Sequence, residues 1–199
     1  METAFCLDLD GTITLEEILP RLAYEVDLYD EIRVLTEATL KGVITFQRSF
    51  KLRCRLLSSI PISRVREIVG SVALDADIES FIRENKRRCF VVTGNLDVWV
   101  EPLIRRLGCE SYTSRAQVDG DRLIAVASVL DKADAVHAVR KHFDRVIAAG
   151  DGMNDASMFE AADIGVAFGG LHEPVPALID VSRFVVTDGR ALCRLLNTL

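Results

Sequence analysis

Two acids stand where a buried strand is expected to end. Asp8 and Asp10 follow the apolar run at residues 4–7 and are separated by a single leucine. Carboxylates at such a position repel each other and lose hydration, so a compensating cation is expected beside them. Asp151 and the nearby Asp155, in the segment GDGMND, follow another apolar run. Carboxylate oxygens are ligands that Mg²⁺ takes, and these acids are therefore candidate ligands of one Mg²⁺ site.

Two further polar residues suit the oxygens of a phosphoryl group. Lys132 opens a helical pattern, and Thr93 follows the apolar run at 89–92. An ammonium and a hydroxyl can each bind one phosphoryl oxygen, and the backbone at Gly11 and Gly94 can approach a phosphate closely because glycine has no side chain. Each group taken alone has an ordinary explanation as a turn or a helix cap. Their joint presence after predicted strands favours one phosphoryl-transfer site.

From residue 89 onward, strand-like and helix-like segments alternate. Short apolar runs at 89–94, 145–151, 164–168 and 183–186 are separated by segments whose apolar residues recur every three or four positions. With the opening run, this alternation predicts β-α units around a parallel sheet, whose strand ends form the ligand crevice. Residues 116–129 differ, because two alternating segments flank a central Asp-Gly-Asp and predict a hairpin.

Residues 14–75 break the alternation. Their segments have helical periodicity throughout, and none contains a convincing strand. We therefore predict an α/β protein with a Rossmann-like parallel sheet and flanking helices, and a small helical cap inserted after the first strand. The predicted domains are a core at 1–13 and 76–199 and a helical cap at 14–75.

Composition excludes several other classes of protein. The 199 residues are 49% hydrophobic and 27% charged, as in ordinary globular chains, and the net charge of −6 comes without the basic stripe expected of a nucleic-acid-binding protein. Five scattered cysteines form no C-x-x-C pair, which favours a reducing compartment over a disulfide framework or a zinc site. The start of the chain lacks the features of a signal peptide, and no apolar run has transmembrane length. We expect a cytoplasmic protein without membrane or nucleic-acid partners.

The polar groups together resemble a known motif set. DLDGT, VVTGN, the isolated Lys132 and GDGMND are similar to the four motifs of the haloacid dehalogenase-like superfamily of phosphatases, and the resemblance covers essentially the whole chain. It implies that Asp8 is the nucleophile and forms an aspartyl-phosphate. It also implies that Asp10 protonates the leaving oxygen and later deprotonates the attacking water. Mg²⁺ would be held by Asp8, the Asp10 backbone carbonyl and Asp151, with Asp155 in support.

The cap resembles that of the phosphoserine phosphatase branch in its length and position. Glu17, nine residues after Asp8, and Arg53 match by spacing the residues that contact the amino group and the carboxylate of phosphoserine in that branch, and Asn154 would add a polar contact near the phosphate. The chain also departs from the branch. Gly11 stands where serine is common, and Asn95 stands where those enzymes usually have glycine.

Alternatives remain open at this level. Charged residues in amphipathic helices, such as Glu17 and Arg53, ordinarily face water. The substrate can then be another small phosphorylated metabolite, such as a sugar or nucleotide phosphate, or the phosphoryl group can pass from phosphoserine to homoserine. A carbon–halogen hydrolase would not need Asp10, and a non-catalytic binding protein would not need Asp8. The oligomeric state, monomer or homodimer, is also open.

Overall fold

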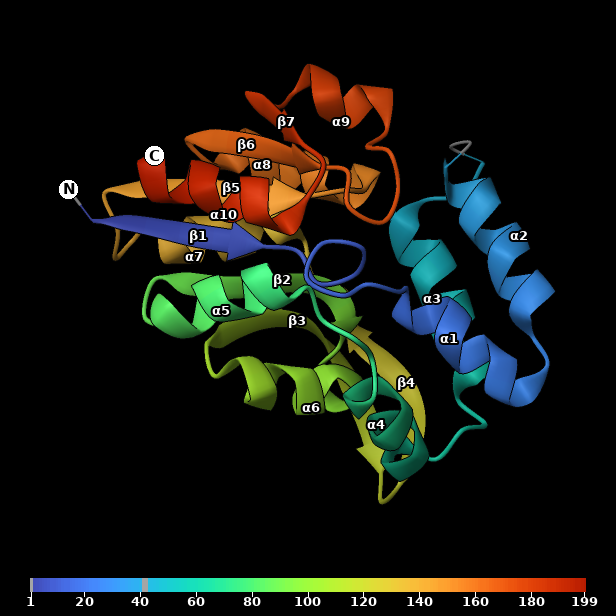
Figure 1. The fold of residues 1–199 in the computed structure, drawn as a ribbon. Coiled ribbons are helices and arrows are strands. Elements are labelled where there is room, and N and C mark those ends of the chain that lie inside the picture. Colours follow the sequence, from blue (N-terminus) through green and yellow to red (C-terminus); the bar gives the residue numbers. More distant parts are fainter. Residues whose placement is uncertain (1, 41–42) are drawn as a thin grey trace.

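The computed structural model of the protein describes residues 2–40 and 43–199. Within them, seven strands form one sheet in the order β4-β3-β2-β1-β5-β6-β7 (Figure 1). Neighbouring strands run parallel except β3 and β4, which form the predicted hairpin. The strands are β1 (Thr3–Leu7), β2 (Cys89–Leu96), β3 (Glu110–Asp119), β4 (Arg122–Ser128), β5 (Arg145–Gly150), β6 (Ile164–Phe168) and β7 (Phe184–Val186).

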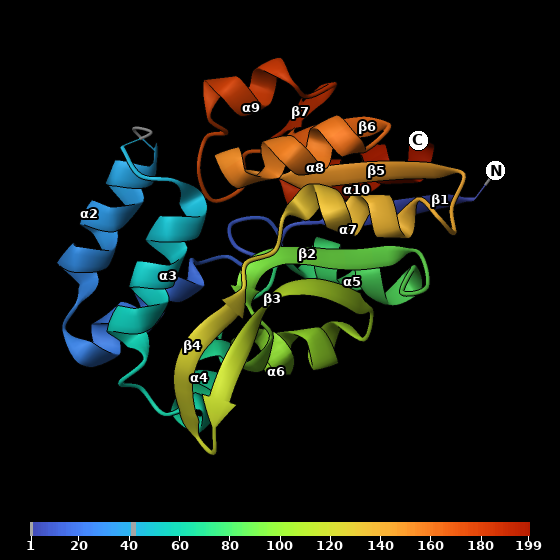
Figure 2. The same ribbon diagram turned by 180° about the vertical axis from the view of Figure 1, so that it is seen from behind.

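Helices cover both faces of the sheet, which confirms the predicted α/β class. Figure 1 looks onto the face that carries α5, α6 and α10, and Figure 2 shows α7 and α8 on the opposite face. β1 is buried on both faces, since Phe5 and Leu7 pack into one apolar cluster and Ala4 and Cys6 into the other. This explains why the strand reads as a continuous apolar run. The core helices are α4 (Ile62–Gly70), α5 (Ala76–Glu84), α6 (Asp97–Leu107), α7 (Lys132–Val139), α8 (Ala156–Ala161), α9 (Pro176–Asp180) and α10 (Gly189–Thr198).

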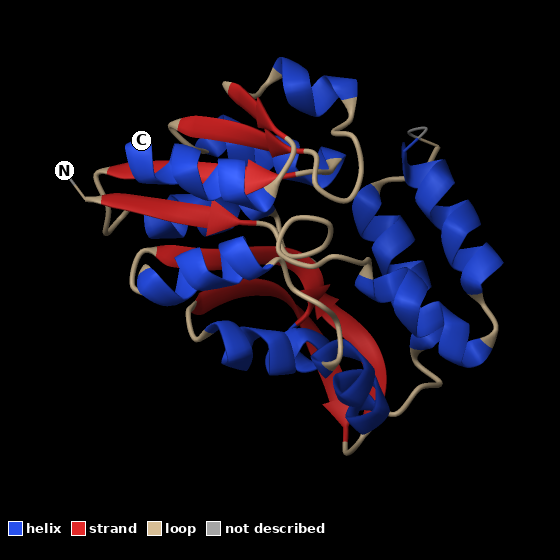
Figure 3. Cartoon of the chain, viewed as in Figure 1, coloured by secondary structure: helices blue, strands red, loops and turns tan. Residues whose placement is uncertain are grey.

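The first three α-helices form a separate group beside the carboxyl ends of the strands (Figure 3). They are α1 (Ile18–Ala23), α2 (Tyr29–Leu40) and α3 (Phe46–Leu57), and a 3₁₀ turn, η1 (Tyr24–Val26), follows α1. Thr14, in the segment that leads into this cap region, forms an antiparallel bridge with Leu74, which lies between α4 and α5. Among the described residues, no helix is long and apolar enough to cross a membrane.

α4 falls inside the range predicted as cap but contacts core elements. The Ile62 N–H donates to the Asp121 carbonyl in the β3–β4 hairpin at 2.9 Å, and Arg66 Nε donates to the Val98 carbonyl in α6 at 2.8 Å. The division of the chain at residues 13 and 75 stays a prediction. The group that Figure 3 shows beside the strand ends is α1–α3.

Candidate active site

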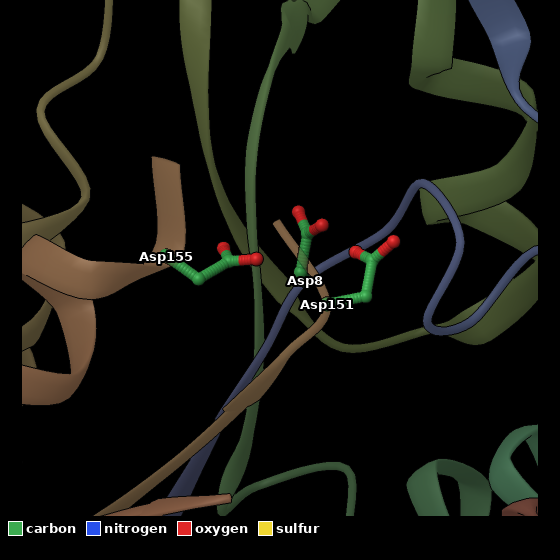
Figure 4. Close-up of side chains that lie close together, drawn as sticks. All are labelled: Asp8, Asp151 and Asp155. Atoms are coloured by element: carbon green, nitrogen blue, oxygen red, sulfur yellow. The ribbon is translucent and has the colours of Figure 1, made fainter. Parts of the chain in front are cut away.

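Three carboxylates meet at the carboxyl end of the central strands. Asp8 directly follows β1, its N–H donates to the Ala149 carbonyl of β5 at 2.9 Å, and its side chain is 5% exposed. Asp151 directly follows β5, and Asp155 lies in the 3₁₀ turn η2 (Met153–Asp155). Figure 4 shows the carboxylates of Asp8 and Asp151 side by side, with that of Asp155 directed toward them, and one oxygen of each lies within 4.8 Å of the others. Parallel neighbours β1 and β5 therefore deliver acids that are 143 positions apart, from 8 to 151, to one place.

The glycines of GDGMND let Asp155 fold back into the site. Asp155 is fully buried, and its Oδ2 accepts from the Gly152 N–H at 2.9 Å. A Cβ at Gly150 would lie 2.4 Å from Asp155 Cγ, so only glycine leaves room for this carboxylate. The segment thus has a steric reason for its composition.

Lys132 is the cation that faces these acids. It is the first residue of α7, which Asp131 caps by accepting from the Ala133 N–H. Lys132 is buried, and its Nζ donates to Asp8 Oδ1 at 2.5 Å and also to Asp155 Oδ1. Burial alone would lower the pKa of Lys132, but the Asp155 and Asp8 carboxylates raise it above its ordinary value. The residue is therefore an ammonium that binds two carboxylates.

One lysine does not balance the charge of this cluster. Burial, and then the carboxylate of Asp155, raise the pKa of Asp8 well above its ordinary value, although Lys132 opposes the shift. Burial and Asp155 likewise raise the pKa of Asp151 to about 7. Raised carboxyl pKa values indicate a shortage of positive charge, and the donors present are hard oxygens. The three acids therefore fit a divalent cation such as Mg²⁺. The Asp10 backbone carbonyl stays a predicted ligand.

Asp10 lies in the loop after β1 and is held from two sides. Its Oδ1 accepts from the Ile18 N–H, the first residue of α1, at 3.1 Å, and its Oδ2 accepts from Asn95 Nδ2 in β2 at 2.6 Å. Burial, followed by the negative charge of Glu17, raises the pKa of Asp10 to about 6. A carboxyl with such a pKa can both give and take a proton near neutral pH.

The predicted phosphate-binding residues surround the same loop. Gly11 adopts a left-handed φ of +71°, and a Cβ there would lie 2.4 Å from Asp151 Oδ2. Its N–H donates to Thr14 Oγ1 at 3.2 Å, so this amide already has a partner. Thr93 is buried in β2 and its Oγ1 accepts from the Asn95 N–H at 3.2 Å, which leaves the hydroxyl proton free to be donated. The roles of these residues in phosphate binding stay predictions.

A cavity of about 770 Å³ extends from these acids to the cap. Most of the predicted site residues line it: Asp8, Asp10, Glu17, Arg53, Thr93, Gly94, Asp151 and Asn154. The structure thus brings together the core residues predicted to carry out phosphoryl transfer and a charged pair from the cap. Gly11, Lys132 and Asp155 lie behind this surface, in contact with the residues that line it.

Arg53 is buried in the cap with donors to spare. It is 7% exposed, its Nη1 lies 3.5 Å from Thr36 Oγ1, and its guanidinium lies 6.0 Å from the centre of the Phe46 ring. Nε has no hydrogen-bond partner within the part of the chain that the structure describes. Burial lowers the pKa of Arg53, since the charged form loses hydration. A buried guanidinium with unused donors is suited to bind an anion.

Some residues of the cavity were not among the predicted site residues. Asn95 contacts Asp10, Phe46 and Phe50 supply aromatic surface from α3, and His172 comes from the loop between β6 and α9. His172 Nε2 lies 3.4 Å from Glu17 Oε1, so this loop reaches across to the cap. A single histidine in a loop has no periodicity or motif spacing that could have indicated this contact.

Comparison with known proteins assigns the family. Residues 5–160 match the model of the haloacid dehalogenase-like hydrolases, and the chain belongs to this family. It is similar to the phosphoserine phosphatase of Methanocaldococcus jannaschii, with 27% identity over 81% of this chain and 82% of the relative. The phosphoserine phosphatase of Archaeoglobus fulgidus is 28% identical over 81% of this chain, which spans about half (51%) of that longer relative.

A solved structure shows the same fold. It is described as a phospho-aspartyl intermediate analogue of phosphoserine phosphatase and superposes with a TM-score of 0.82, at 24% identity, over 98% of both chains. The resemblance between the motifs and this family is thereby confirmed, and so is the α/β fold class.

Proposed function

We propose that the protein is a Mg²⁺-dependent phosphomonoester hydrolase and that its substrate is O-phosphoserine. One observation carries the proposal: a single cavity is lined by Asp8 and Asp10 on the core side and by Glu17 and Arg53 on the cap side. The first pair suits phosphoryl transfer, and the second pair suits a leaving group with one ammonium and one carboxylate. The phosphoserine phosphatases to which the chain is similar support this choice of substrate.

In the first step, a carboxylate oxygen of Asp8 attacks phosphorus. An Asp8–phosphorus bond forms as the bond from phosphorus to the leaving oxygen breaks, and the Asp10 carboxyl gives its proton to that oxygen. Lys132 Nζ orients Asp8 through the contact at 2.5 Å. Asp8, the Asp10 backbone carbonyl and Asp151 would hold a bound Mg²⁺, with Asp155 in support, and the ion would neutralise charge on the acids and on the phosphoryl oxygens.

In the second step, the Asp10 carboxylate accepts a proton from water. The water oxygen bonds to phosphorus, the bond to Asp8 breaks, and inorganic phosphate leaves with Asp10 protonated again. The pKa of about 6 for Asp10 suits this alternation between acid and base.

On the cap side, each charge has a complementary partner in phosphoserine. Glu17 would bind the ammonium, and the unused donors of Arg53 would bind the carboxylate in the planar, two-pronged manner of a guanidinium. Asn154 lines the cavity beside Asp151 and would add a polar contact near the phosphate. The cytoplasmic location and the choice between monomer and homodimer stay predictions.

A screen of phosphorylated metabolites with Mg²⁺ tests the proposal. We expect phosphoserine to give the highest kcat/KM, with release of serine and inorganic phosphate in equal amounts. Sugar and nucleotide phosphates serve as comparison substrates, and a higher kcat/KM on one of them would overturn the assignment of phosphoserine. Phosphoserine is also assayed with homoserine present, and formation of phosphohomoserine in place of inorganic phosphate would show transfer and not hydrolysis.

A further inference from the structure

Asn95 lies at an irregularity of β2 that turns its side chain toward the active site. Thr93 pairs with Thr113 of β3, and the next pair joins Leu96 to Ser114, so Gly94 and Asn95 have no opposing residue on β3. An insertion of this kind re-aims the side chains that it carries. The Ser114 hydroxyl donates to the Gly94 carbonyl at 2.6 Å and fixes the insertion.

The amide nitrogen of Asn95 is committed to Asp10. Nδ2 donates to Asp10 Oδ2 at 2.6 Å and lies 3.3 Å from Thr93 Oγ1, while the Asn95 backbone N–H donates to the same hydroxyl at 3.2 Å. Asn95 is 3% exposed, so these contacts are shielded from water. The side chain is therefore held in one orientation from the core side.

The other support of Asp10 comes from the cap. Oδ1 accepts from the Ile18 N–H, at the start of α1, and within the described parts of the chain no third group donates to this carboxyl. Asp10 itself lies in a loop and not in the sheet. Because α1 belongs to the cap and β2 to the core, Asn95 is the contact that fixes Asp10 relative to Asp8.

The amide oxygen of Asn95 is buried without a partner. Oδ1 has no hydrogen-bond partner among residues 2–40 and 43–199, although the residue lines the cavity. A buried polar group without a partner is uncommon and calls for a specific reason. Here the reason is the donor of the same amide: Asn95 is held at the edge of the substrate cavity by the bond from its Nδ2 to Asp10, and its oxygen is left without a partner.

We propose that Asn95 is a positioning residue for proton transfer, which aims the Asp10 carboxyl at the leaving oxygen. This inference rests on the proposed phosphomonoester hydrolysis but not on phosphoserine as the substrate. In the first step, the Asp10 O–H bond breaks and a bond from that proton to the leaving oxygen forms. A carboxyl held by the cap alone would lose this alignment, and misplacement by about 1 Å can cost roughly 100-fold in rate.

The leaving group separates this role from a merely structural one. Phenolate is a more basic leaving group than p-nitrophenolate and depends more on a proton from the enzyme. Both phenyl phosphate and p-nitrophenyl phosphate lack the amino and carboxylate groups that Glu17 and Arg53 would bind. A loss of proton transfer therefore falls more heavily on phenyl phosphate, whereas a general disturbance of the cavity affects both compounds alike.

The experiment compares kcat and KM of Asn95→Ala with the wild type on these two compounds in Mg²⁺. We expect kcat to fall at least about tenfold more on phenyl phosphate than on p-nitrophenyl phosphate, with little change in KM. Asn154→Ala, the same substitution on a cavity residue without a contact to Asp10, is the matched control and should affect both compounds equally. Asn95→Leu, which keeps the side-chain shape, gives the same comparison if Asn95→Ala does not fold.

A second arm joins Asn95→Ala to Asp10→Asn. If Asn95 acts through Asp10, the double variant is no slower on phenyl phosphate than Asp10→Asn alone. Equal losses of Asn95→Ala on the two compounds, or additive losses in the double variant, would overturn the inference. A wild type that turns over both aryl phosphates but not phosphoserine would refute the proposed substrate and leave this test intact.

Discussion

Phe46 of the cap lies directly against Gly94 of the core. A Cβ built on Gly94 would be 2.9 Å from Cζ of the Phe46 ring and 3.3 Å from Cε1. Phe46 is the first residue of α3, and both residues line the cavity. The absence of a side chain at position 94 therefore lets the cap approach the strand that carries Thr93. We predict that the cap closes over the site to exclude water and reopens to release the products.

Gly94→Ala should hold the cap away from the core. The added methyl group collides with the Phe46 ring, and we expect kcat/KM for phosphoserine to fall by about 10-fold to 100-fold. Phe46→Ala added to Gly94→Ala removes the collision and should restore part of the loss, measured by steady-state kinetics of the four combinations. Losses that simply add would contradict a steric contact between these two residues.

Asp8→Asn should abolish turnover and leave the fold intact. An amide cannot form the acyl phosphate, and loss of a nucleophile costs about 10⁴-fold or more in kcat. Because burial raises the pKa of Asp8, the neutral amide relieves an unfavourable charge, and Lys132 keeps its contact with Asp155. We expect a metal-free melting temperature no lower than that of the wild type. Steady-state release of phosphate by pure Asp8→Asn protein would refute the nucleophile assignment.

Stabilisation by Mg²⁺ should grow as the pH rises. Burial and the carboxylate of Asp155 raise the pKa of the predicted ligand Asp151 from 3.8 to about 7, and they raise that of Asp8 well above its ordinary value. Raised carboxyl pKa values give stability that is complete below the unfolded value and is lost as the pH rises through the folded values. The metal-free protein therefore loses this contribution between about pH 4 and about pH 7, where the ionised acids become free to bind Mg²⁺.

Thermal unfolding with EDTA or with excess Mg²⁺ measures this effect. We expect a larger rise in melting temperature on adding Mg²⁺ at about pH 8 than at about pH 5.5. Asp151→Asn is the control and should lose most of the rise at the higher pH. An equal rise at both pH values would show that these carboxyls do not hold the ion, and activity that survives EDTA would show that turnover does not need it.

Arg53→Ala should discriminate between substrates. Removing one partner of a buried charge pair typically costs 2–5 kcal/mol, so kcat/KM for phosphoserine should fall by at least about 30-fold. p-Nitrophenyl phosphate has no carboxylate, so the kcat/KM of Arg53→Ala for this compound should fall far less. Arg53→Lys keeps the charge but not the planar guanidinium, and its kcat/KM for phosphoserine should lie between those of the wild type and Arg53→Ala. An equal loss on both substrates would mean that Arg53 does not bind the carboxylate.

The strands were predictable where burial on both faces makes a run continuously apolar. β1, β5 and β6 follow this rule, and the acids placed after β1 and β5 indicated a shared site at the end of the sheet. The first half of β3 was not predicted. In this half, residues 110–114, burial changes from exposed to buried without alternating, and it pairs parallel with β2, while the rest of β3 pairs antiparallel with β4. A strand that changes partners midway has no single periodicity.

Side-chain contacts between segments far apart in the sequence were not predictable from local pattern. The hydrogen bond from Asn95 to Asp10 joins positions 85 residues apart, and it depends on the irregular register between β2 and β3. In the sequence, Asn95 stood out only because phosphoserine phosphatases usually have glycine at this position. The contact of His172 with Glu17 depends on the position of the loop after β6, which no pattern in the sequence predicts.

The central position of β1 bears on when the site can form during synthesis. Phe5 pairs on one side with Cys89 and on the other with Ile147. β1 is therefore synthesised first but can pair only after β2 and β5 have been synthesised. A nascent chain that ends before β5 has Asp8 but neither Asp151 nor Asp155. Such distant pairing is slow to form, and the earliest segment stays exposed to misfolding until then. The chemistry of this protein is thus acquired in one late event and not built up as the chain emerges.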